Sequence, residues 1–493
     1  MSLGMLMRMG LAILVLGMFV VPRTGAQGLC ASADSGKVAC TVANVYGPGG
    51  LTTNGTTLVA HNFISGQTSP NSFILNVTAL SSAVGGQLGV LPLVSPASGI
   101  SFSFDKSLGI FVPSEYNFGP VLSERAGTIG RHKLLFGFAY QNFDFDTLDG
   151  IDLKNLHAAF AQTPLGTCSP LGGPGPQNQA GCAFIRDTLV TTNNIDLRVN
   201  QYTAFVSFGL TSRLDVSVAI PTVNVRMAVT SIATVHNNGL DDGFQFVASS
   251  SGQGCANPCF SRTFFNSTGS TGIGDVTVRA KYNLWKGEKA GFAVGGDVRF
   301  PTGDSLNYLG SGAYGIKPFG AFSFNYKRLS AHVNGGYEWN GESFLAGNLA
   351  PSPDPVTGVT PAPSKASLPS QFFYTAGAEV GIFKRLSGAF DFLGSRYFNA
   401  TRIENSTFTE LPACDPSKVN SIPTNVCNNF LPTGIQDPNV TQSTGSYNTA
   451  DAAVGLRFRP FGKFLVTANA IVKLNDAGLR SKFIPLLGIS YSH

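Results

Sequence analysis

The chain has 493 residues, only 12% of which are charged, and its formal net charge is +5. Soluble domains carry about 25% charged residues, so this composition is unusual for one. The small net charge and the lack of a basic cluster or an RNA-type aromatic motif predict that nucleic acid is not a partner. The length suits two or three ordinary domains, or one large β-barrel.

Residues 1–26 have the pattern of a secretory signal peptide. Arg8 supplies the positive charge, an apolar run follows over residues 9–21, and small residues lead to Ala26, after which we expect cleavage. The apolar run is shorter than the roughly 20 residues that a spanning helix needs. No later apolar run is long enough either, so the exported chain is predicted to be soluble or a β-barrel.

Residues 27–132 begin with sequence rich in Gly, Thr, Ser and Asn that has no clear period. Residues 100–114 then alternate as a hairpin that turns over 105–109. Three interpretations are open: a plug inside a barrel lumen, two additional barrel strands at 73–80 and 100–113, or a periplasmic extension. We favour the plug, because a lumen lined by charges would otherwise leak.

Strand-like segments recur from residue 133, separated alternately by long and short connections. Long outer loops and short periplasmic turns are typical of outer-membrane barrels, whereas a soluble sandwich has no reason to sort its loops. Residues 133–493 are therefore predicted to form an all-β, transmembrane, antiparallel up-and-down barrel of about 12 strands, or 14 with the N-terminal hairpin. The predicted strands are 133–146, 194–210, 213–229, 272–285, 290–302, 315–327, 330–340, 371–383, 387–398, 448–459, 462–474 and 481–491.

The segment at 272–285, GIGDVTVRAKYNLW, shows how the two faces of a predicted strand differ. Arg279 and Lys281 share one face, and Val276 and Val278 share the other. In a barrel the charged face lines a wet lumen and the apolar face meets lipid. Acids and bases are nearly balanced, so we expect no strongly ion-selective pore. They either guide a solute or simply fill a narrow barrel with salt bridges. The predicted lumen-lining residues are Asp275, Arg279, Lys281, Asp297, Arg299, Lys317, His332, Glu338, Glu379, Asp451, Arg457 and Lys473.

The second and third predicted strands change phase, near Asn200 and at Pro221. A β-bulge shifts the phase of a strand, and proline inside a sheet is confined to edges and bulges. We therefore predict a bulge at each position. This interpretation places Arg198 and Arg226 in the lumen.

The eight cysteines form four close neighbour pairs in turn-rich sequence. An even number in an exported chain predicts disulfides that close small loops. Metal binding is the alternative, with Cys255 and Cys259 the best spaced, but no histidine lies near them in the sequence. We therefore predict no metal and no cofactor. The predicted disulfides are Cys30–Cys40, Cys168–Cys182, Cys255–Cys259 and Cys414–Cys427.

The C-terminus ends with Leu486, Gly488, Tyr491 and His493 at the spacing of the signal that barrel proteins present to their assembly machinery. The usual terminal residue is Phe, so His493 is a variant. We expect the last strand to bind the barrel-assembly machinery, and the outer face of the barrel to contact outer-membrane lipid.

No sequence motif of a hydrolase, metalloprotease or nucleotide-binding enzyme is found. Of the six histidines only His332 falls on an inward strand face, near Glu338, and no nucleophile can be paired with it. We predict a structural histidine, no catalytic residue and no enzyme activity. An outer-membrane hydrolase is the third of the functions considered.

Three segments, TGIGDVTVRAKY from residue 271, AVGGDVRFPTGD from 293 and LGSGAYGIKPF from 309, resemble an outer-membrane transporter family named for the MetA pathway of phenol degradation. The similarity covers most of residues 100–493. It implies a barrel related to the long-chain fatty-acid transporters, which pass hydrophobic molecules. The residues most specific to the resemblance are Gly272, Gly274, Asp275, Pro301, Thr302, Gly303 and Asp304.

These observations predict an outer-membrane channel or transporter for small hydrophobic or aromatic solutes. The alternative is a structural or surface-interaction barrel whose long, disulfide-closed outer loops bind a partner. Neither the solute nor the oligomeric state follows from the sequence.

Overall fold

The structure is a computed structural model. The signal-peptide prediction and the predicted pairs Cys168–Cys182 and Cys414–Cys427 fall outside the residues that it describes. Within those residues, no helix has both the length and the apolar character needed to cross a membrane. The described residues are 30, 36–46, 52–54, 60–62, 83–88, 101–105, 110–114, 123–161, 187–238, 245–246, 259–349, 362–383, 385–410, 412, 433–461 and 463–492.

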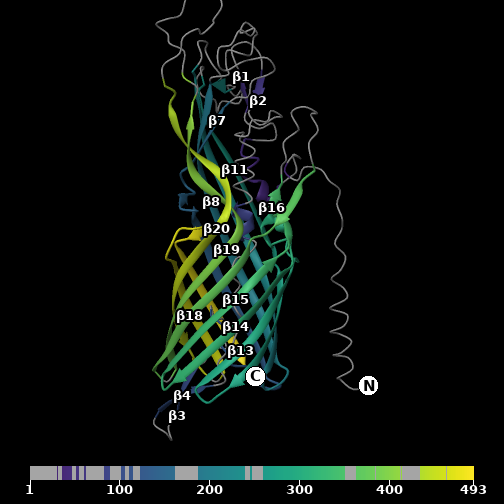
Figure 1. Ribbon diagram of the computed structural model, residues 1–493, viewed down its shortest axis with the longest axis vertical. Coiled ribbons are helices and arrows are strands. Elements are labelled where there is room, and N and C mark those ends of the chain that lie inside the picture. Colours follow the sequence, from purple (N-terminus) through teal and green to yellow (C-terminus); the bar gives the residue numbers. More distant parts are fainter. Residues whose placement is uncertain are drawn as a thin grey trace, which may run out of the picture.

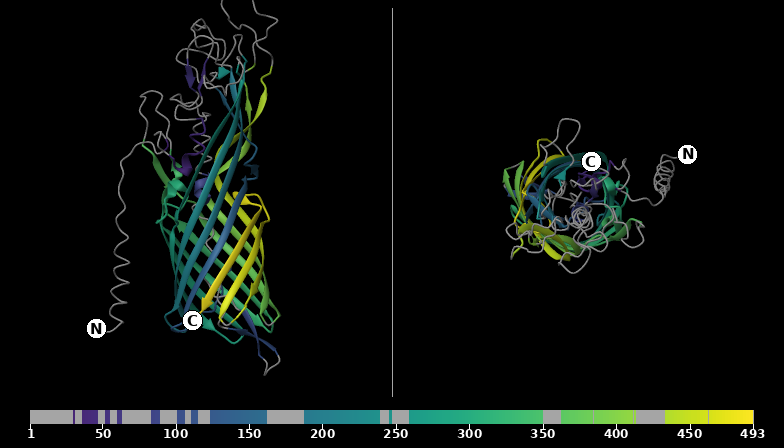
Figure 2. Two further views of the ribbon diagram at one scale, coloured as in Figure 1. Left: turned by 180° about the vertical axis from the view of Figure 1, so that it is seen from behind. Right: turned by 90° about the horizontal axis from the view of Figure 1, so that it is seen from above.

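Twelve antiparallel strands close into a barrel (Figures 1 and 2). The last strand pairs with the first, which closes the ring. The prediction of an all-β, twelve-strand antiparallel barrel is confirmed. The strands in chain order are β5 (Leu134–Leu148), β8 (Thr188–Gly209), β9 (Leu214–His236), β12 (Val276–Lys286), β13 (Ala290–Phe300), β14 (Gly315–Tyr326), β15 (Leu329–Asn340), β18 (Ser370–Phe383), β19 (Leu386–Thr409), β20 (Gln436–Phe458), β21 (Phe464–Lys473) and β23 (Phe483–Ser492).

The N-terminal hairpin does not join the barrel. Its strands β3 (Ser101–Asp105) and β4 (Ile110–Ser114) pair only with each other, as a separate two-stranded sheet. They lie beyond the end of the barrel that carries the C-terminus (Figure 1), which we call the lower end. The fourteen-strand alternative is therefore wrong for the hairpin, while residues 73–80 lie outside the described part of the chain.

The barrel strands β8, β9, β19 and β20 are 22 to 24 residues long and continue beyond the upper rim (Figure 1). The distal parts of β8, β9, β19 and β20, with β7 (Leu156–Ala161) and β11 (Ser261–Ile273), form an extension that we call the tower. The sequence analysis placed much of the tower in loops, at 230–271 and 399–447, which is wrong for β11 and for the distal parts of β9, β19 and β20. Its interior holds the largest cluster of buried apolar side chains in the described structure.

The strand faces keep their alternation into the tower, but the polarity of each face inverts at the rim. Along β8, odd-numbered residues point inward over the whole strand. In the barrel most of these residues are polar, as at Gln201 and Ser207, with Phe205 an exception. In the tower most are apolar, as at Leu197, with Thr191 and Asn193 exceptions. The outward face changes in the opposite sense, from Val206 in the barrel to Arg198 in the tower. Lipid therefore surrounds the lower part and water the upper part.

The two predicted β-bulges are wrong. The pairing of β8 with β9 runs without a shift from Thr188 opposite His236 to Gly209 opposite Asp215. The apparent change of phase is a change of surroundings, because a tower strand needs its apolar face inside. As a result Arg198 and Arg226 lie on the outer surface of the tower and not in the lumen.

Pro221 marks the point where β9 exchanges one neighbour for another. On the lower side β9 pairs with β12, and on the upper side it pairs with β11. The carbonyl of Pro221 accepts a hydrogen bond from Gly274 N, at 2.7 Å, in the gap between those two neighbours. Since the N–H and C=O of one strand residue point to the same side, the missing donor of proline faces this gap. Proline is tolerated there, and the pairing of β9 with β8 stays in register across it.

Short elements complete the fold. A small sheet lies at the top of the tower, a hairpin stands on the rim, and two 3₁₀ turns connect the N-terminal segment to that rim (Figure 1). These elements are β1 (Thr52–Asn54), β2 (Ala60–Asn62), β10 (Gln245–Phe246), β16 (Glu342–Asn348), β17 (Ser364–Ser367), β6 (Ile151–Asp152), β22 (Leu479–Ser481), η1 (Val38–Cys40) and η2 (Ser305–Asn307).

Candidate functional site

The lumen of the barrel contains a piece of the chain itself. Residues 123–129, which we call the lumen segment, lead into β5 and bond to the inward faces of several strands. Ser123 Oγ lies 2.7 Å from Thr375 Oγ1 of β18. Ala126 N donates to Ser323 Oγ of β14 at 3.0 Å. Polar inward residues thus form hydrogen bonds with the backbone and side chains of a segment that crosses the lumen. Without this segment, water would have to supply those hydrogen bonds.

Glu124 lies at the centre of one charged cluster. Its carboxylate contacts Arg279 and, at 2.8 Å, Lys281 Nζ, both on β12. Arg279 also pairs with Asp297 of β13 at 2.6 Å, and Lys317 of β14 lies 3.7 Å from the same Asp297. Buried charges are stable only when paired and hydrogen-bonded. Glu124 therefore completes a network that the strands alone would leave with excess positive charge.

Arg125 is fully buried in a second charged cluster. Its guanidinium donates to Glu379 Oε2 at 2.7 Å and to Ser330 Oγ at 3.1 Å. Arg457 of β20 donates to the same Glu379 oxygen, and Ser387 donates to the other, at 2.6 Å. Two arginines thus share one buried carboxylate, and one of them comes from the lumen segment.

Glycines let long side chains meet across an intervening strand. His332 of β15 lies opposite Gly377 of β18, which lies opposite Asp391 of β19. His332 Nε2 and Asp391 Oδ1 are 2.7 Å apart, whereas a Cβ on Gly377 would stand 2.0 Å from Asp391 Oδ1. Glu338, which the sequence analysis placed near His332, forms an ion pair with Arg299 instead. Strand alternation predicts the face on which a residue lies. It does not predict that a side chain can extend over a glycine on the next strand to a residue on the strand beyond.

Arg299 uses the same device. It lies on β13 and extends over Gly315 of β14 to Asn340 Oδ1 at 2.6 Å and Glu338 Oε1 at 3.1 Å on β15. A Cβ on Gly315 would stand 3.0 Å from the guanidinium. The remaining predicted lumen residues pair toward the upper rim: Asp451 with Arg480, and Lys473 with Asp146 and Asp476.

Asp275 does not line the lumen as a strand residue. The predicted strand 272–285 is interrupted, because β11 ends at Ile273 and β12 begins at Val276. Asp275 lies in the gap and accepts hydrogen bonds from Gly303 N at 3.1 Å and from Ser311 N at 2.7 Å. It therefore fixes the loop after β13 and does not face a solute.

The residues most specific to the family resemblance gather at this rim. Thr302 Oγ1 donates to Gly274 O at 2.7 Å and accepts from Val276 N at 3.0 Å. A Cβ on Gly274 would stand 2.9 Å from Leu309 O, and one on Gly303 would stand 2.8 Å from the backbone of Gly310. Gly272 packs on Leu309 in the same way, and Pro301 directly follows β13. The motif thus shapes the rim where barrel and tower meet.

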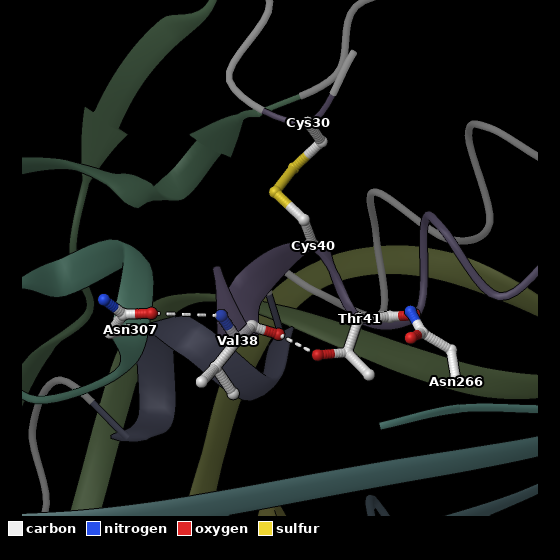
Figure 3. Close-up of a disulfide and its surroundings, with 6 residues drawn as sticks. All are labelled: Cys30, Val38, Cys40, Thr41, Asn266 and Asn307. Atoms are coloured by element: carbon white, nitrogen blue, oxygen red, sulfur yellow. Dashed lines mark hydrogen bonds between the residues drawn. A yellow bond between two sulfur atoms is a disulfide. The ribbon is translucent and has the colours of Figure 1, made fainter. Parts of the chain in front are cut away.

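Asp304 connects the rim to the N-terminal segment. It caps η2 through Leu306 N and pairs with Lys37 Nζ at 2.8 Å. Burial opposes ionisation of this carboxyl, but the hydrogen bond and charge of Lys37 outweigh it, so the pKa of Asp304 is lowered. Val38 N donates to Asn307 Oδ1 at 3.3 Å, beside a disulfide that joins Cys30 to Cys40 (Figure 3). Cys259 is also disulfide-bonded, and its predicted partner Cys255 lies outside the described residues.

A cavity of about 220 Å³ opens in the lumen. Glu124 of the lumen segment and Gln87, from a short helix at residues 83–88, both contribute to its wall. Two cations of the wall lie over aromatic rings: Lys317 Nζ is 4.9 Å from the Phe373 centroid, and the Arg279 guanidinium is 5.0 Å from that of Phe319. The aromatic members of the wall are Phe143, Phe145, Phe319, Phe373, Tyr397 and Tyr447.

The lumen segment is the functional feature that the sequence analysis resolved least. Residues 27–132 were predicted as a plug as a whole, but Glu124 and Arg125 carried no distinguishing signal. They follow a stretch without period and precede the first strand. One clue exists in the sequence, since two consecutive opposite charges there could match the inward charges of the barrel.

One family model matches part of the chain. Residues 185–351 match the family model "Putative MetA-pathway of phenol degradation". The resemblance noted in the sequence is thereby confirmed over this stretch. It spans β8 to β16 and includes the rim motif from Gly272 to Asp304. No curated protein matches the chain.

Solved structures of outer-membrane proteins are similar at low identity. An outer membrane channel from Pseudomonas putida F1 is 11% identical with a TM-score of 0.40, and the match covers 76% of this chain and 100% of that chain. A Pseudomonas aeruginosa FadL homologue is 10% identical with a TM-score of 0.26, covering 74% and 89%. The outer membrane channel DcaP of Acinetobacter baumannii is 8% identical with a TM-score of 0.23, covering 76% and 100%.

Proposed function

We propose that this protein is a channel of the bacterial outer membrane for small hydrophobic or aromatic solutes. In this proposal, residues 1–26 direct the export that brings the protein to that membrane. A closed barrel satisfies every backbone group of its strands within the membrane. Its outward face carries large apolar side chains, such as Val333, Phe372 and Val454, which suit contact with lipid. The third function considered, a hydrolase, has no specific support from the lumen contacts.

The lumen cavity carries the proposal about the solute. An engineered cavity of about 150 Å³ holds benzene, so the 220 Å³ cavity is large enough for a one-ring molecule. Aromatic rings form part of the wall and offer stacking partners. Lys317 and Arg279 are placed to attract the π face or the oxygen of a phenol-like solute.

Flux through liposomes tests this function. The purified barrel should carry phenol faster than it carries glucose. Phe373→Ala removes a lumen ring, and we expect the phenol concentration for half-maximal flux to rise about 2- to 10-fold, the equivalent of one aromatic contact. Phe372→Ala is the matched control, since Phe372 is 44% exposed on the lipid face. Phenol flux no faster than in protein-free liposomes would refute the channel.

We further propose that the lumen segment is the constriction of the channel. It bonds to β12, β14, β15 and β18, and so crosses the lumen at that level. A double variant, Ser123→Cys with Thr375→Cys, should lock it in place, because the two hydroxyl oxygens lie 2.7 Å apart. We expect oxidation to stop phenol flux and reductant to restore it. Wild type treated with the same reductant controls for the native disulfides. Unchanged flux in the locked variant would show that solutes bypass the segment.

A second candidate function is favoured by the tower. Four strands extend beyond the rim and enclose their own apolar core, which a simple pore does not need. The tower could serve to bind a partner at the cell surface. An inert barrel in the flux assay, with the tower still folded, would favour this surface-interaction protein over the channel.

A further inference from the structure

Three potential metal ligands meet between the two ribbons of the tower. His236 is the last residue of β9, Glu410 directly follows β19, and Asp437 is the second residue of β20. One ligand atom from each lies within 4.8 Å of the others. β9 belongs to one ribbon, and β19 and β20 pair in the other. The cluster therefore joins ribbons that are not hydrogen-bonded neighbours in the sheet.

The two carboxyl groups of the cluster are deeply buried. The Glu410 side chain is 0% exposed and that of Asp437 is 9% exposed, while the His236 ring is 33% exposed. His236 Nδ1 lies 2.6 Å from Glu410 Oε1 and 4.0 Å from Asp437 Oδ2. Asp437 Oδ2 is buried without a hydrogen-bond partner. One oxygen is thus aimed at the cluster and unsatisfied there.

The charges of the cluster do not balance when both carboxyl groups are ionised. In the described part of the chain, the salt bridges of Glu410 and Asp437 run only to His236. A protonated histidine carries one positive charge against two carboxylates, and it can donate only one proton from Nδ1. Uncompensated buried charge is costly. A divalent cation between a neutral imidazole and the two carboxylates would neutralise the site and satisfy Asp437 Oδ2.

The geometry suits a transition-metal ion. Tetrahedral zinc with bonds of about 2.0 Å places its ligand atoms about 3.3 Å apart. The separations from His236, 2.6 Å to Glu410 and 4.0 Å to Asp437, lie on either side of this value, and all three ligand atoms lie within 4.8 Å of one another. One imidazole with carboxylates suits zinc better than calcium, which prefers oxygen alone. The partly exposed histidine leaves an entry path and room for a water ligand.

A supporting group holds one of the carboxylates in place. Asn238 Nδ2 donates to Glu410 Oε2 at 2.8 Å, and Asn238 N donates to Asp187 Oδ1 at 2.9 Å. Hydrogen bonds of this kind orient metal-binding carboxylates. Glu410 Oε1 is thereby left facing His236.

We propose that His236, Glu410 and Asp437 bind a divalent transition-metal ion, Zn²⁺ by ligand type, which clamps the two ribbons of the tower together. The site lies away from the lumen and does not depend on the proposed channel function. A metal ion here would contradict the expectation that the chain has no metal site, which was based on the cysteines. The ligands were hard to find in the sequence, because long segments separate them.

The test uses untagged, chelator-treated protein in detergent, with Zn²⁺ competed against a chromogenic chelator. Wild type should bind one Zn²⁺ that His236→Gln and Asp437→Asn do not bind. Asn238→Ala should weaken binding about 10- to 100-fold. His157→Gln is the matched control, since His157 lies on β7 of the same tower and contacts Thr192 instead; it should bind like wild type. Heat-modifiable gel migration verifies that each variant barrel is folded.

A second readout reports the clamp itself. Zn²⁺ should slow protease cleavage of the tower in wild type and in His157→Gln, but not in Asp437→Asn. Equal Zn²⁺ binding by wild type and His236→Gln would overturn the site. Calcium binding that survives His236→Gln would overturn the assignment to a transition metal. Zn²⁺ binding without any protection from protease would overturn the clamp.

Discussion

The barrel and the tower are built from the same strands but turned inside out relative to each other. In the barrel β8 presents Val206 to lipid and Ser207 to the lumen, whereas in the tower it presents Arg198 to water and Leu197 to the core. Strand geometry fixes which residues share a face. The surroundings decide which face is apolar. One continuous ribbon can therefore serve as a membrane wall and as a soluble protein.

The two interiors are also stabilised by different interactions. The tower core buries apolar side chains, for which each Å² removed from water contributes about 25 cal/mol. The barrel interior buries ions, which stabilise only as complete sets, because removing one partner leaves another charge uncompensated. Damage to the tower core should therefore scale with the size of the deleted group, and damage to the lumen with the charge left behind.

The largest effect is expected in the lumen. Glu379→Ala would leave Arg125 and Arg457 buried without their shared carboxylate. We expect unfolding in urea to require about 3–5 kcal/mol less free energy. Asp196→Ala in the tower is the control, because its ion pair with Arg198 is exposed and should contribute at most about 1 kcal/mol. Similar losses in both variants would contradict the distinction between the two interiors.

A smaller effect is expected on the outer faces. Val333 on the barrel and Ile232 on the tower are similarly exposed, at 54% and 48%. Val333→Arg would place a charge against lipid at a cost of about 2–4 kcal/mol, whereas Ile232→Arg would meet water and should be tolerated. Folding yield into lipid vesicles, judged by heat-modifiable gel migration, measures both. Equal yields would place both residues in one medium.

The smallest effect is expected where the two regions meet. The pKa of Asp304 is lowered, so its contribution to stability is present above the ordinary aspartate value of 3.8 and is lost as the pH falls below it. Both partners of the Lys37–Asp304 pair are about 40% exposed, so we expect less than about 1 kcal/mol. The protection factors of the amides around Val38, which correct each exchange rate for the intrinsic rate at that pH, should fall between pH 5 and about pH 3 in wild type. Lys37→Ala should show less of this change, and an equal change in both would exclude the pair as its cause.

The barrel strands could be predicted from the sequence, because lipid requires an apolar outer face along each strand that crosses the membrane. Strands such as β13 and β15 alternate between lipid-facing and lumen-facing residues along their whole length, and their observed ends lie within two residues of the predicted ones. The rule fails where the medium changes. β19 was predicted to end at residue 398, and it continues to Thr409 because polar residues can face water there.

The lumen contacts could not be predicted because they join distant parts of the chain. Arg125 reaches Glu379 over 254 positions in the sequence. The alternation placed Glu379 on the correct face, but nothing in it distinguishes Arg457, Arg125 or a solute as its partner. The contact of His332 with Asp391 could not be predicted for a related reason, since it requires a glycine on the strand between them.

The change of neighbours at Pro221 separates the strand pairing of the tower from that of the barrel. Below this residue β9 pairs with β12, and above it with β11, and the two pairings differ in register by one residue. The two residues that join β11 to β12, Gly274 and Asp275, must therefore accommodate this offset. We expect a hairpin inserted at the far end of β11, near Ser261, to leave the twelve-strand ring in register as long as this junction is kept.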